Sequence, residues 1–444
     1  MSGWSGGNGG KRTLRVKALA RVEGEGALNL VVRGGQVEQV QFKIYEPPRF
    51  YEALVRGRDF QEVPDIVARI CGICPVAYQM GACHALEKAL GVFNQVDPAI
   101  RALRNVLYCG EWIESHVLHM FMLHLPDFLG YESALSMAQD HAPLVKRSLR
   151  VKKAGNDLVA LLGGRAVHPV GVCVGGFYRA PDLVQVSEVL SELKPCLEEM
   201  CELVAVLAKL VTFPELERDY EFVALCPDNE YPFNLGRIKS NKGLDVDQEE
   251  FGSAVHEQQV EHSTALHAVL GLRGAYMVGP LARLNLNHEK LHPRAADVLQ
   301  KAVAAVGKPL PWRNTYLSLL ARGVETVHAL AWAIDLLADY ALPPRSRIPI
   351  TPRAGIGGHG TEAPRGICWH EYRTEADGTI ASARIIPPTS QNQKTIEDDL
   401  RELAPAILDL SEEDATLRCE HLIRNYDPCI SCSTHYLKLT RTIL

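Results

Sequence analysis

The sequence predicts a mainly α-helical protein with small β regions, an α+β class in which long helices form the core and sheets lie at the periphery. Two observations support this prediction. Apolar residues recur with helical periodicity through most of the chain after Asp97-Pro98. Short stretches of alternating polar and apolar residues, broken by glycine, occur near both ends.

The first β region lies near the N-terminus. The stretches "RTLRVKALA", "GALNLVVR" and "QVEQVQFKIY" alternate between polar and apolar residues, so they predict a small antiparallel sheet. Residues 1–12, "MSGWSGGNGGKR", are rich in Gly and lack the apolar segment of a secretory signal. We therefore expect a flexible lead-in before the sheet.

The middle of the chain predicts a bundle of long helices, because its apolar positions repeat with a period close to that of the α-helix. The predicted helices cover residues 99–125, 133–162, 181–212, 253–270, 286–306 and 312–341.

A second β region is expected after "PPRSRIPITPRAGIGGHGTEAPRG", where Pro and Gly become dense. The stretches "ICWHEYRT" and "TIASARIIP" predict strands, and "TIEDDLRELAPAIL" predicts a return to helix. We find no internal repeat and no convincing linker. Both β regions are therefore expected to pack on one helical body, a single domain spanning residues 13–435.

Composition excludes several classes of function. Of the 444 residues, 47% are hydrophobic and 23% are charged, as in an ordinary soluble protein. The net charge of -6 gives no electrostatic reason to expect a nucleic-acid partner. The longest apolar stretches, such as "LVAVLAKLV", fall short of the ~20 residues that a membrane span needs. We expect a cytoplasmic protein without a direct membrane span.

Twelve cysteines are present, and four of them form two Cys-x-x-Cys pairs at opposite ends of the chain, Cys71 with Cys74 and Cys429 with Cys432. A chain of this size needs no disulfides, so paired cysteines indicate metal binding or redox chemistry. A structural four-cysteine zinc site is the ordinary interpretation, although the halves of such sites usually lie close in sequence. Spacing alone favours a metal without naming it. The other eight cysteines are expected to be small buried hydrophobic residues.

The residues around these cysteines narrow the choice. "RICGICPVAY" and "DPCISCSTH" resemble the two signature motifs of the large, catalytic subunit of [NiFe]-hydrogenases. Five further stretches, in family order, resemble other motifs of that subunit: "ARVEGEG", "RFYEALVRGRDF", "ESHVLHMF", "GGRAVHPVGVCVGG" and "GTEAPRG". The resemblance runs from residue 20 to residue 435, nearly the whole chain, and it implies the large-subunit fold of that family.

The resemblance implies a nickel bound by four thiolates, two of which bridge to an iron that carries one carbon monoxide and two cyanides. By position, Cys71 and Cys429 correspond to the nickel-only ligands, and Cys74 and Cys432 to the bridging ligands. Thiolates suit such soft, redox-active metals. Glu23 matches the glutamate that exchanges a proton with a nickel-bound thiolate during reversible cleavage of H2 into protons and electrons.

Further residues are implied around the iron ligands. Arg365, in "EAPRG", resembles the arginine that overhangs the open metal position and contacts a cyanide. Pro387 and Thr389, in "RIIPPTSQN", resemble the segment that surrounds the other cyanide. Thr389 is the expected donor there, because Pro388 has neither a side-chain donor nor an N–H.

A second metal, usually magnesium, is implied near the active site. Glu52 and His435 resemble its side-chain ligands, and the backbone carbonyl of Arg384 is the third expected protein ligand. His168 and Arg179 lie in the central motif. Two roles stay open for them: they line the path to an electron-accepting cluster, or they are structural.

Two departures from the family pattern bear on the subgroup. Glu25 stands where the family usually has His, and Tyr78 stands where many members have His after the first cysteine pair. Together with the signature motifs, these two departures make the sequence most similar to the cytosolic NAD(P)-linked bidirectional group, group 3, which includes the sulfhydrogenases. His116 and His119 lie one helical turn apart and are expected to support the core rather than bind metal.

The resemblance also implies partners. The chain has no further cysteine grouping for iron–sulfur clusters and no glycine-rich dinucleotide fingerprint. We therefore expect an Fe–S small subunit and, beyond it, flavin- and NAD(P)-binding subunits. Residues 436–444 would be the extension that a maturation protease removes once nickel-insertion factors have acted.

Three alternatives remain at this point. A hydrogen-sensing regulatory hydrogenase would keep the same metal site. A non-catalytic scaffold related to the quinone-site subunit of complex I would share the fold, but those relatives lack the cysteine pairs. A structural zinc protein would use the four cysteines alone.

Overall fold

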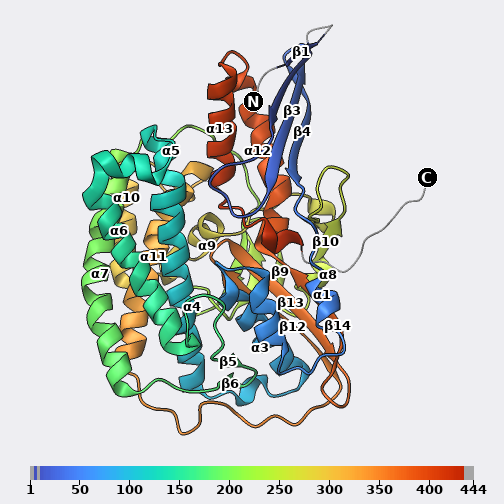
Figure 1. Cartoon of the computed structure of the whole chain (residues 1–444), viewed down its shortest axis with the longest axis vertical. Coiled ribbons are helices and arrows are strands. Elements are labelled where there is room, and N and C mark those ends of the chain that lie inside the picture. Colours follow the sequence, from blue (N-terminus) through green and yellow to red (C-terminus); the bar gives the residue numbers. More distant parts are fainter. Residues whose placement is uncertain (1–4, 8–10, 435–444) are drawn as a thin grey trace, which may run out of the picture.

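A bundle of long helices occupies one side of the molecule, and small sheets with shorter helices occupy the other (Figure 1). The computed structural model describes residues 5–7 and 11–434. His435, the expected extension 436–444 and part of the expected lead-in lie outside the described residues. The predicted fold class, mainly helical with peripheral sheets, is confirmed.

The α-helices are α1 (Tyr51–Leu54), α2 (Val63–Val67), α3 (Pro75–Ala89), α4 (Pro98–Val117), α5 (Leu125–Leu129), α6 (Ala134–Gly163), α7 (Leu183–Leu210), α8 (Phe251–Ala254), α9 (Pro280–Asn287), α10 (Pro293–Val306), α11 (Ser318–Ala338), α12 (Pro388–Ile407) and α13 (Glu412–Arg424). The shorter helical turns are η1 (Ala68–Ile70), η2 (Phe93–Gln95), the π-helical η3 (Leu118–His124), η4 (Gly271–Arg273), η5 (His288–Lys290), η6 (Thr315–Leu317) and η7 (Ser431–Thr434).

Local sequence signals fix the ends of the long helices. Asp97 caps α4 by accepting from the backbone N–H of Ala99, and Pro98 takes the first helical position. Capping boxes open α6 at Ser133 and α7 at Asp182. These three helices and α11 pack side by side, and α11 is buried along most of its length. The bundle therefore supplies a rigid wall behind the site.

The strands form separate small antiparallel sheets. The N-terminal sheet has the order β1 (Ser5–Gly7), β2 (Lys11–Val16), β3 (Gly26–Arg33), β4 (Gln36–Ile44). The second expected β region is a sheet of β12 (Gly355–Ala363), β13 (Gly366–Thr374) and β14 (Ile380–Ile386). The remaining strands are β5 (Val172–Cys173) with β6 (Gly176–Phe177), β7 (Val223–Cys226) with β8 (Arg237–Ser240) and β9 (Asp245–Val246), and β10 (Val255–Gln258) with β11 (His267–Leu270).

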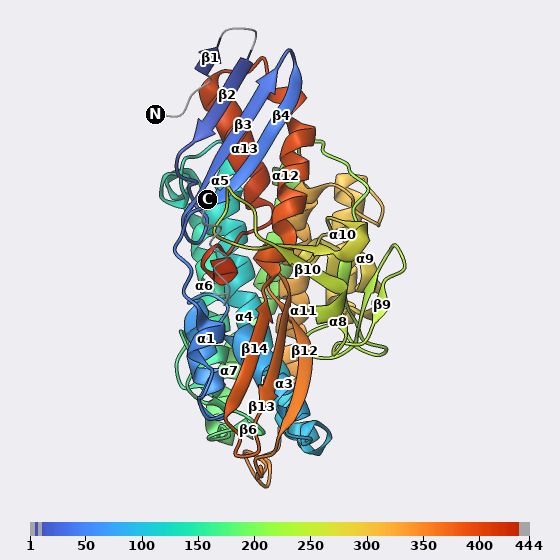
Figure 2. The ribbon, with the colours of Figure 1, turned by 90° about the vertical axis from the view of Figure 1, so that its right-hand side faces the viewer.

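Each main sheet packs on a helix that matters for the site. The N-terminal sheet lies against α12 and α13 at one end of the molecule, and β12–β14 lie below it (Figure 2). Glycines let β12 approach α3 closely, since a Cβ atom on Gly355 would stand 2.0 Å from the carbonyl oxygen of Ala89. This contact holds α3, which begins next to Cys74, against the sheet.

The predicted helix over residues 253–270 is wrong. Only the short α8 is helical there, and β10 and β11 pair as a hairpin joined by an eight-residue connection, residues 259–266. Val255 and Leu270 are buried in a small apolar cluster beneath β13, and His256 between them is exposed. Tertiary packing of this alternating pattern outweighs the helical periodicity seen in the sequence.

Other boundaries differ less. The expected helix over 286–306 is divided into α9 and α10 by His292-Pro293, because proline cannot donate within a helix. The sequence also left α3, α13 and the sheet of β7, β8 and β9 unassigned. Every helix among the described residues is too short or too polar to cross a lipid bilayer.

Candidate metal centre

The two cysteine pairs lie beside or within short helical segments. Cys71 follows η1 directly, and Cys74 is the residue that precedes the first turn of α3. Cys429 lies between α13 and η7, and Cys432 lies within η7. All four side chains are buried, so they form a site that bulk water does not reach freely.

The four Sγ atoms lie within 4.8 Å of one another. Cys71 and Cys429 are separated by 3.2 Å, Cys74 and Cys432 by 3.5 Å, and Cys429 and Cys432 by 2.8 Å. Hydrogen bonds from the three neighbouring thiols hold the pKa of Cys71 well below that of a free thiol, whereas burial raises the pKa of Cys429. Four buried sulfurs at this spacing cannot all ionise without a cation, and they suit a soft metal.

Arg49 fastens the two cysteine motifs to each other. Its guanidinium donates to the carbonyl of Ile70, directly before Cys71, at 2.7 Å and also to the carbonyl of Ser431. The backbone N–H of Arg49 donates to the carbonyl of Thr434 at 2.7 Å. One residue thus positions both halves of the site.

Glu23 is paired with the last cysteine motif. Glu23 and Cys429 form a backbone bridge, and Ile430 donates its N–H to the Glu23 carbonyl at 3.0 Å. The Glu23 carboxylate accepts from Cys429 Sγ at 3.2 Å and from the Ser431 N–H at 3.0 Å. Burial, with Cys71 nearby, raises the pKa of Glu23. Glu25 is exposed.

Arg365 lies buried near the cysteines and is held by Asp427. Its Nε donates to the Asp427 carbonyl at 2.6 Å, and its Nη2 lies 3.0 Å from the Asp427 carboxylate. The remaining nitrogen, Nη1, is buried without a hydrogen-bond partner among the described residues. A charged donor is therefore left available beside the four sulfurs.

The segment expected around the second cyanide also reaches the site. Pro387 precedes α12, and Thr389 lies in its first turn. The Thr389 hydroxyl accepts from the Cys429 N–H at 3.0 Å, which leaves its own hydrogen free to donate. The Thr389 hydroxyl can therefore still donate to a ligand of the metal, and its expected role stays a prediction.

The expected magnesium ligands are partly described. Glu52 is buried on α1, and its carboxylate accepts from the N–H of Ile385 at 2.8 Å. The carbonyl of Arg384 belongs to the same trans peptide and points in the opposite direction, so this hydrogen bond does not direct it toward Glu52. The side chain of Arg384 turns away and pairs with Glu257. His435 lies outside the described residues, so the three-ligand set stays a prediction.

The histidines of the other motifs have structural partners. His116 Nε2 lies 3.0 Å from Glu325, and His119 Nε2 lies 2.7 Å from the carbonyl of Arg424. His168 Nδ1 contacts the carbonyl of Ala68, just before the first cysteine, at 2.8 Å. Arg179 is exposed.

Sequence reasoning missed three residues that the geometry places at the site: Arg49, Asp427 and Ser431. Asp427 could have been found, because it stands two residues before Cys429 within the quoted motif. Arg49 is the first residue of the quoted motif "RFYEALVRGRDF", but its role could not be predicted there, since its partners are backbone carbonyls from both ends of the chain.

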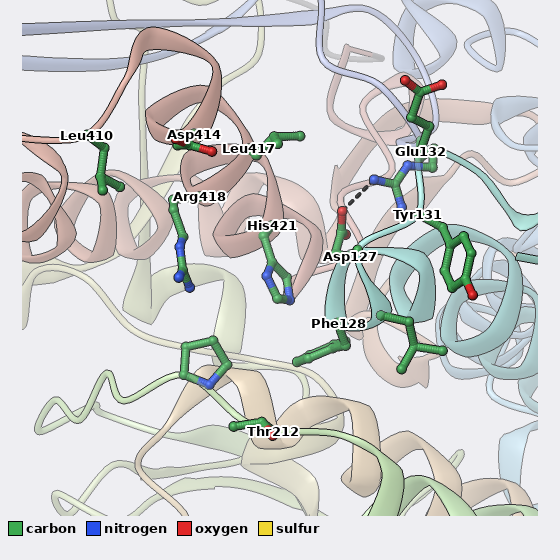
Figure 3. Close-up of a pocket in the computed structure, with 14 residues that line it drawn as sticks. Asp127, Phe128, Tyr131, Glu132, Thr212, Leu410, Asp414, Leu417, Arg418 and His421 are labelled. Atoms are coloured by element: carbon green, nitrogen blue, oxygen red, sulfur yellow. Dashed lines mark hydrogen bonds and ion pairs between the residues drawn. The ribbon is translucent and has the colours of Figure 1, made fainter. Parts of the chain in front are cut away.

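A surface pocket of about 620 Å³ lies elsewhere, between α5, α13 and the segment after α7 (Figure 3). Its lining includes Arg21, Asp127, Phe128, Arg418 and His421 and none of the four cysteines. The pocket is therefore separate from the sulfur site.

Fold and site together define a helical metalloprotein subunit with one buried four-thiolate centre. The family profile described as nickel-dependent hydrogenase matches residues 49–149. The alpha subunit of sulfhydrogenase 1 from Pyrococcus furiosus is 33% identical over 431 residues, covering 96% of this chain and 98% of the relative. The beta subunit of the NAD-reducing hydrogenase HoxS from Cupriavidus necator is 26% identical, covering 96% of this chain and 95% of the relative.

Among solved structures, an NAD⁺-reducing [NiFe]-hydrogenase in the H2-reduced state superimposes with a TM-score of 0.86 and 25% identity, covering 96% of this chain and 99% of that one. The chain belongs to the nickel-dependent hydrogenase family and is a large subunit of that family. Its similarity to sulfhydrogenase alpha subunits agrees with the predicted group 3.

Proposed function

We propose that the chain is the catalytic subunit of a [NiFe]-hydrogenase that reversibly splits H2 into protons and electrons. The observation that carries this proposal is the set of four buried sulfurs within 4.8 Å, with a carboxylate 3.2 Å from one of them. Family membership and this geometry support the same function.

Cys71, Cys74, Cys429 and Cys432 would hold the nickel–iron centre. The donor set fits such a group, because soft thiolates are its expected ligands and the buried Nη1 of Arg365 lacks a partner among the described residues. When bound, the centre supplies the Lewis-acidic, redox-active position at which hydrogen is cleaved.

Glu23 would receive the proton that is released onto Cys429. The proton on Cys429 Sγ faces the Glu23 carboxylate at hydrogen-bond distance, so transfer needs no large movement. Ser431 contacts the Glu23 carboxylate, and its hydroxyl donates to Glu46 Oε2 at 3.1 Å. We place the proton exit through Ser431 and Glu46, a route that does not need a histidine at position 25.

Arg365 and Thr389 would surround the diatomic ligands of the iron, one carbon monoxide and two cyanides. Arg365 is kept in place by two contacts with Asp427 and offers Nη1, which has no hydrogen-bond partner within residues 5–7 and 11–434, as a donor. Thr389 offers its hydroxyl hydrogen, with Pro387 beside it at the start of α12. Both donors come from rigid elements, which favours a fixed ligand geometry.

A magnesium ion would be bound by Glu52, the carbonyl of Arg384 and His435. The burial of Glu52 on α1, with its carboxylate beside β14, supports its part in this ligand set. Carboxylate and carbonyl oxygens are suitable ligands for this hard cation.

Electrons would leave through an Fe–S small subunit, and then pass to NAD(P) through flavin- and NAD(P)-binding subunits. The likeness to NAD-reducing hydrogenases supports this acceptor. Val167 and Val170 expose about half of their surface on a loop that His168 joins to the turn before Cys71. Exposed apolar residues at that position favour docking of the small subunit there.

We further place the complex in the cytoplasm, where a maturation protease and nickel-insertion factors would act on the chain. The test of the whole proposal is an infrared spectrum of the purified complex. One carbonyl band and two cyanide bands are expected, together with H2-dependent reduction of NAD(P). A complex with four intact cysteines that binds only zinc after co-expression with the maturation machinery would overturn the proposal.

A further inference from the structure

A second cluster of metal-ligating side chains lies away from the four cysteines. It consists of His262, in the connection between β10 and β11, His267 at the start of β11, and Glu397 on α12. One ligand atom from each residue lies within 4.8 Å of the other two. Figure 2 shows the hairpin beside α12.

Two of the three side chains, those of Glu397 and His262, are held in place by contacts that need no metal. Glu397 Oε1 accepts from the N–H of Phe42 on β4 at 3.0 Å and lies 2.7 Å from His262 Nε2. The amide of Gln393, one helical turn earlier on α12, donates to the carbonyl of Leu266 at 3.0 Å. The carboxylate and the connection that carries His262 are therefore fixed relative to each other.

The same connection is fastened to the end of β4. Thr264 donates its hydroxyl to the carbonyls of Ile44 and Glu46 at 3.0 and 2.8 Å, and its N–H donates to Ile44 at 2.7 Å. The cluster is thus a preorganised junction of β4, the β10–β11 connection and α12.

A single histidine–carboxylate hydrogen bond does not account for the cluster. His267 is 2% exposed, and its Nε2 is buried without a hydrogen-bond partner among the described residues. A buried imidazole nitrogen of this kind costs free energy unless water or a cation occupies its lone pair.

A comparable cluster elsewhere also has buried imidazole nitrogens without partners among the described residues, but its carboxylate is already paired with arginine. His124, Asp127 and His421 also lie within 4.8 Å of one another. There, Arg424 donates to both oxygens of Asp127, at 2.7 and 2.8 Å, and Arg21 also pairs with it. Two guanidinium groups already neutralise that carboxylate and repel a cation.

We propose that His262, His267 and Glu397 form a binding site for a divalent transition metal of the zinc type. Two imidazoles and one carboxylate are a ligand set that zinc uses, and water would complete the coordination. Lys394 and Asp398 flank the cluster on α12 and pair with each other. Lys394 therefore does not occupy the Glu397 carboxylate, which remains available to a metal. The metal would join the N-terminal sheet to α12, independently of the nickel–iron centre.

The test uses the full-length chain in which all four cysteines of the metal centre, Cys71, Cys74, Cys429 and Cys432, are replaced by serine, so that no thiolate of that site can bind zinc. After equilibration with zinc and gel filtration, we expect one zinc per chain by elemental analysis. In this background, His267→Gln and Glu397→Gln should weaken zinc binding at least about a hundredfold in competition with a chromophoric chelator. His256→Gln, an exposed histidine on the same hairpin, should leave binding unchanged.

Two further readouts separate this site from other sources of zinc binding. Cobalt(II) bound at the site should show no thiolate-to-metal charge-transfer absorption. Zinc should raise the melting temperature of the parent chain and not of His262→Gln, a replacement at the more exposed rim of the cluster. Absence of bound zinc, equal binding after His267→Gln in a folded chain, or a thiolate band with cobalt would each overturn the proposal.

Discussion

Glu23 and Cys429 are joined twice, by a backbone bridge and by a side-chain contact of 3.2 Å between the carboxylate and Sγ. The bridge sets the distance between the two side chains, because neither residue can shift without breaking backbone hydrogen bonds. The carboxylate is therefore fixed at the thiol from which we propose it takes a proton.

Replacement of Glu23 by Gln should lower H2-dependent turnover by about two to four orders of magnitude, because the amide cannot carry the proton. Nickel content and the infrared bands should remain, since the backbone bridge is kept. The measurement is the rate of H2 oxidation per nickel. Glu25→Gln, at an exposed position two residues away, is the matched control, and an equal loss there would contradict the role of Glu23.

Glu46→Gln should slow turnover by about tenfold or more, because Ser431 would lose an acceptor that can bind a proton. Nickel content should not change. The effect is measured as a drop in rate with a larger solvent isotope effect. Glu38→Gln, exposed on β4, should leave both quantities as they are. Full activity of the Glu46 variant would exclude this exit.

Arg49→Ala should reduce the nickel retained per chain during purification. The replacement removes the donors that hold the carbonyls of Ile70 and Ser431, so the two cysteine motifs can separate. Limited proteolysis should then cut the segment after α13 sooner. Arg33→Ala, which removes an exposed arginine of the same N-terminal region, should change neither measurement.

Glu325 forms the centre of a buried ionic network with Arg283 and His116. Burial alone would raise the pKa of Glu325, but Arg283 lowers it to about 2. Glu325→Gln leaves Glu362 as the remaining carboxylate partner of Arg283 and should cost about 3 kcal/mol of stability. Thermal unfolding is the measurement. Asp297→Asn, which breaks an exposed ion pair with Lys301, should cost at most about 1 kcal/mol.

His421 should contribute to acid sensitivity. Burial lowers its pKa to about 4 in the folded chain, against a value near 6.5 when unfolded. As the pH falls from 6.5 to 4, the unfolded state binds a proton that the folded state does not, so stability is lost across this window. His421→Leu should make the decline shallower by up to about 1.4 kcal/mol per pH unit. An unchanged decline in melting temperature would contradict this assignment.

The sequence predicted the residues of the centre better than the contacts that assemble them. The four cysteines, Glu23 and Arg365 carry distinctive motifs, and the structure brings them together. Arg49 begins a quoted motif, but its role could not be predicted, because the backbone carbonyls that it binds cannot be recognised from residue types. The hairpin of β10 and β11 was missed for a related reason, since its burial depends on β13, which is distant in sequence.

The spacing of the cysteine motifs has a consequence for biosynthesis. The sulfur cluster joins residues 358 positions apart, so a ribosome that has translated most of the chain has made only one of its two halves. A prematurely ended product would carry Cys71 and Cys74 alone and could not enclose the metals. The complete set of four sulfurs therefore exists only after Cys432 has been translated, and we expect shortened chains to have no hydrogenase activity.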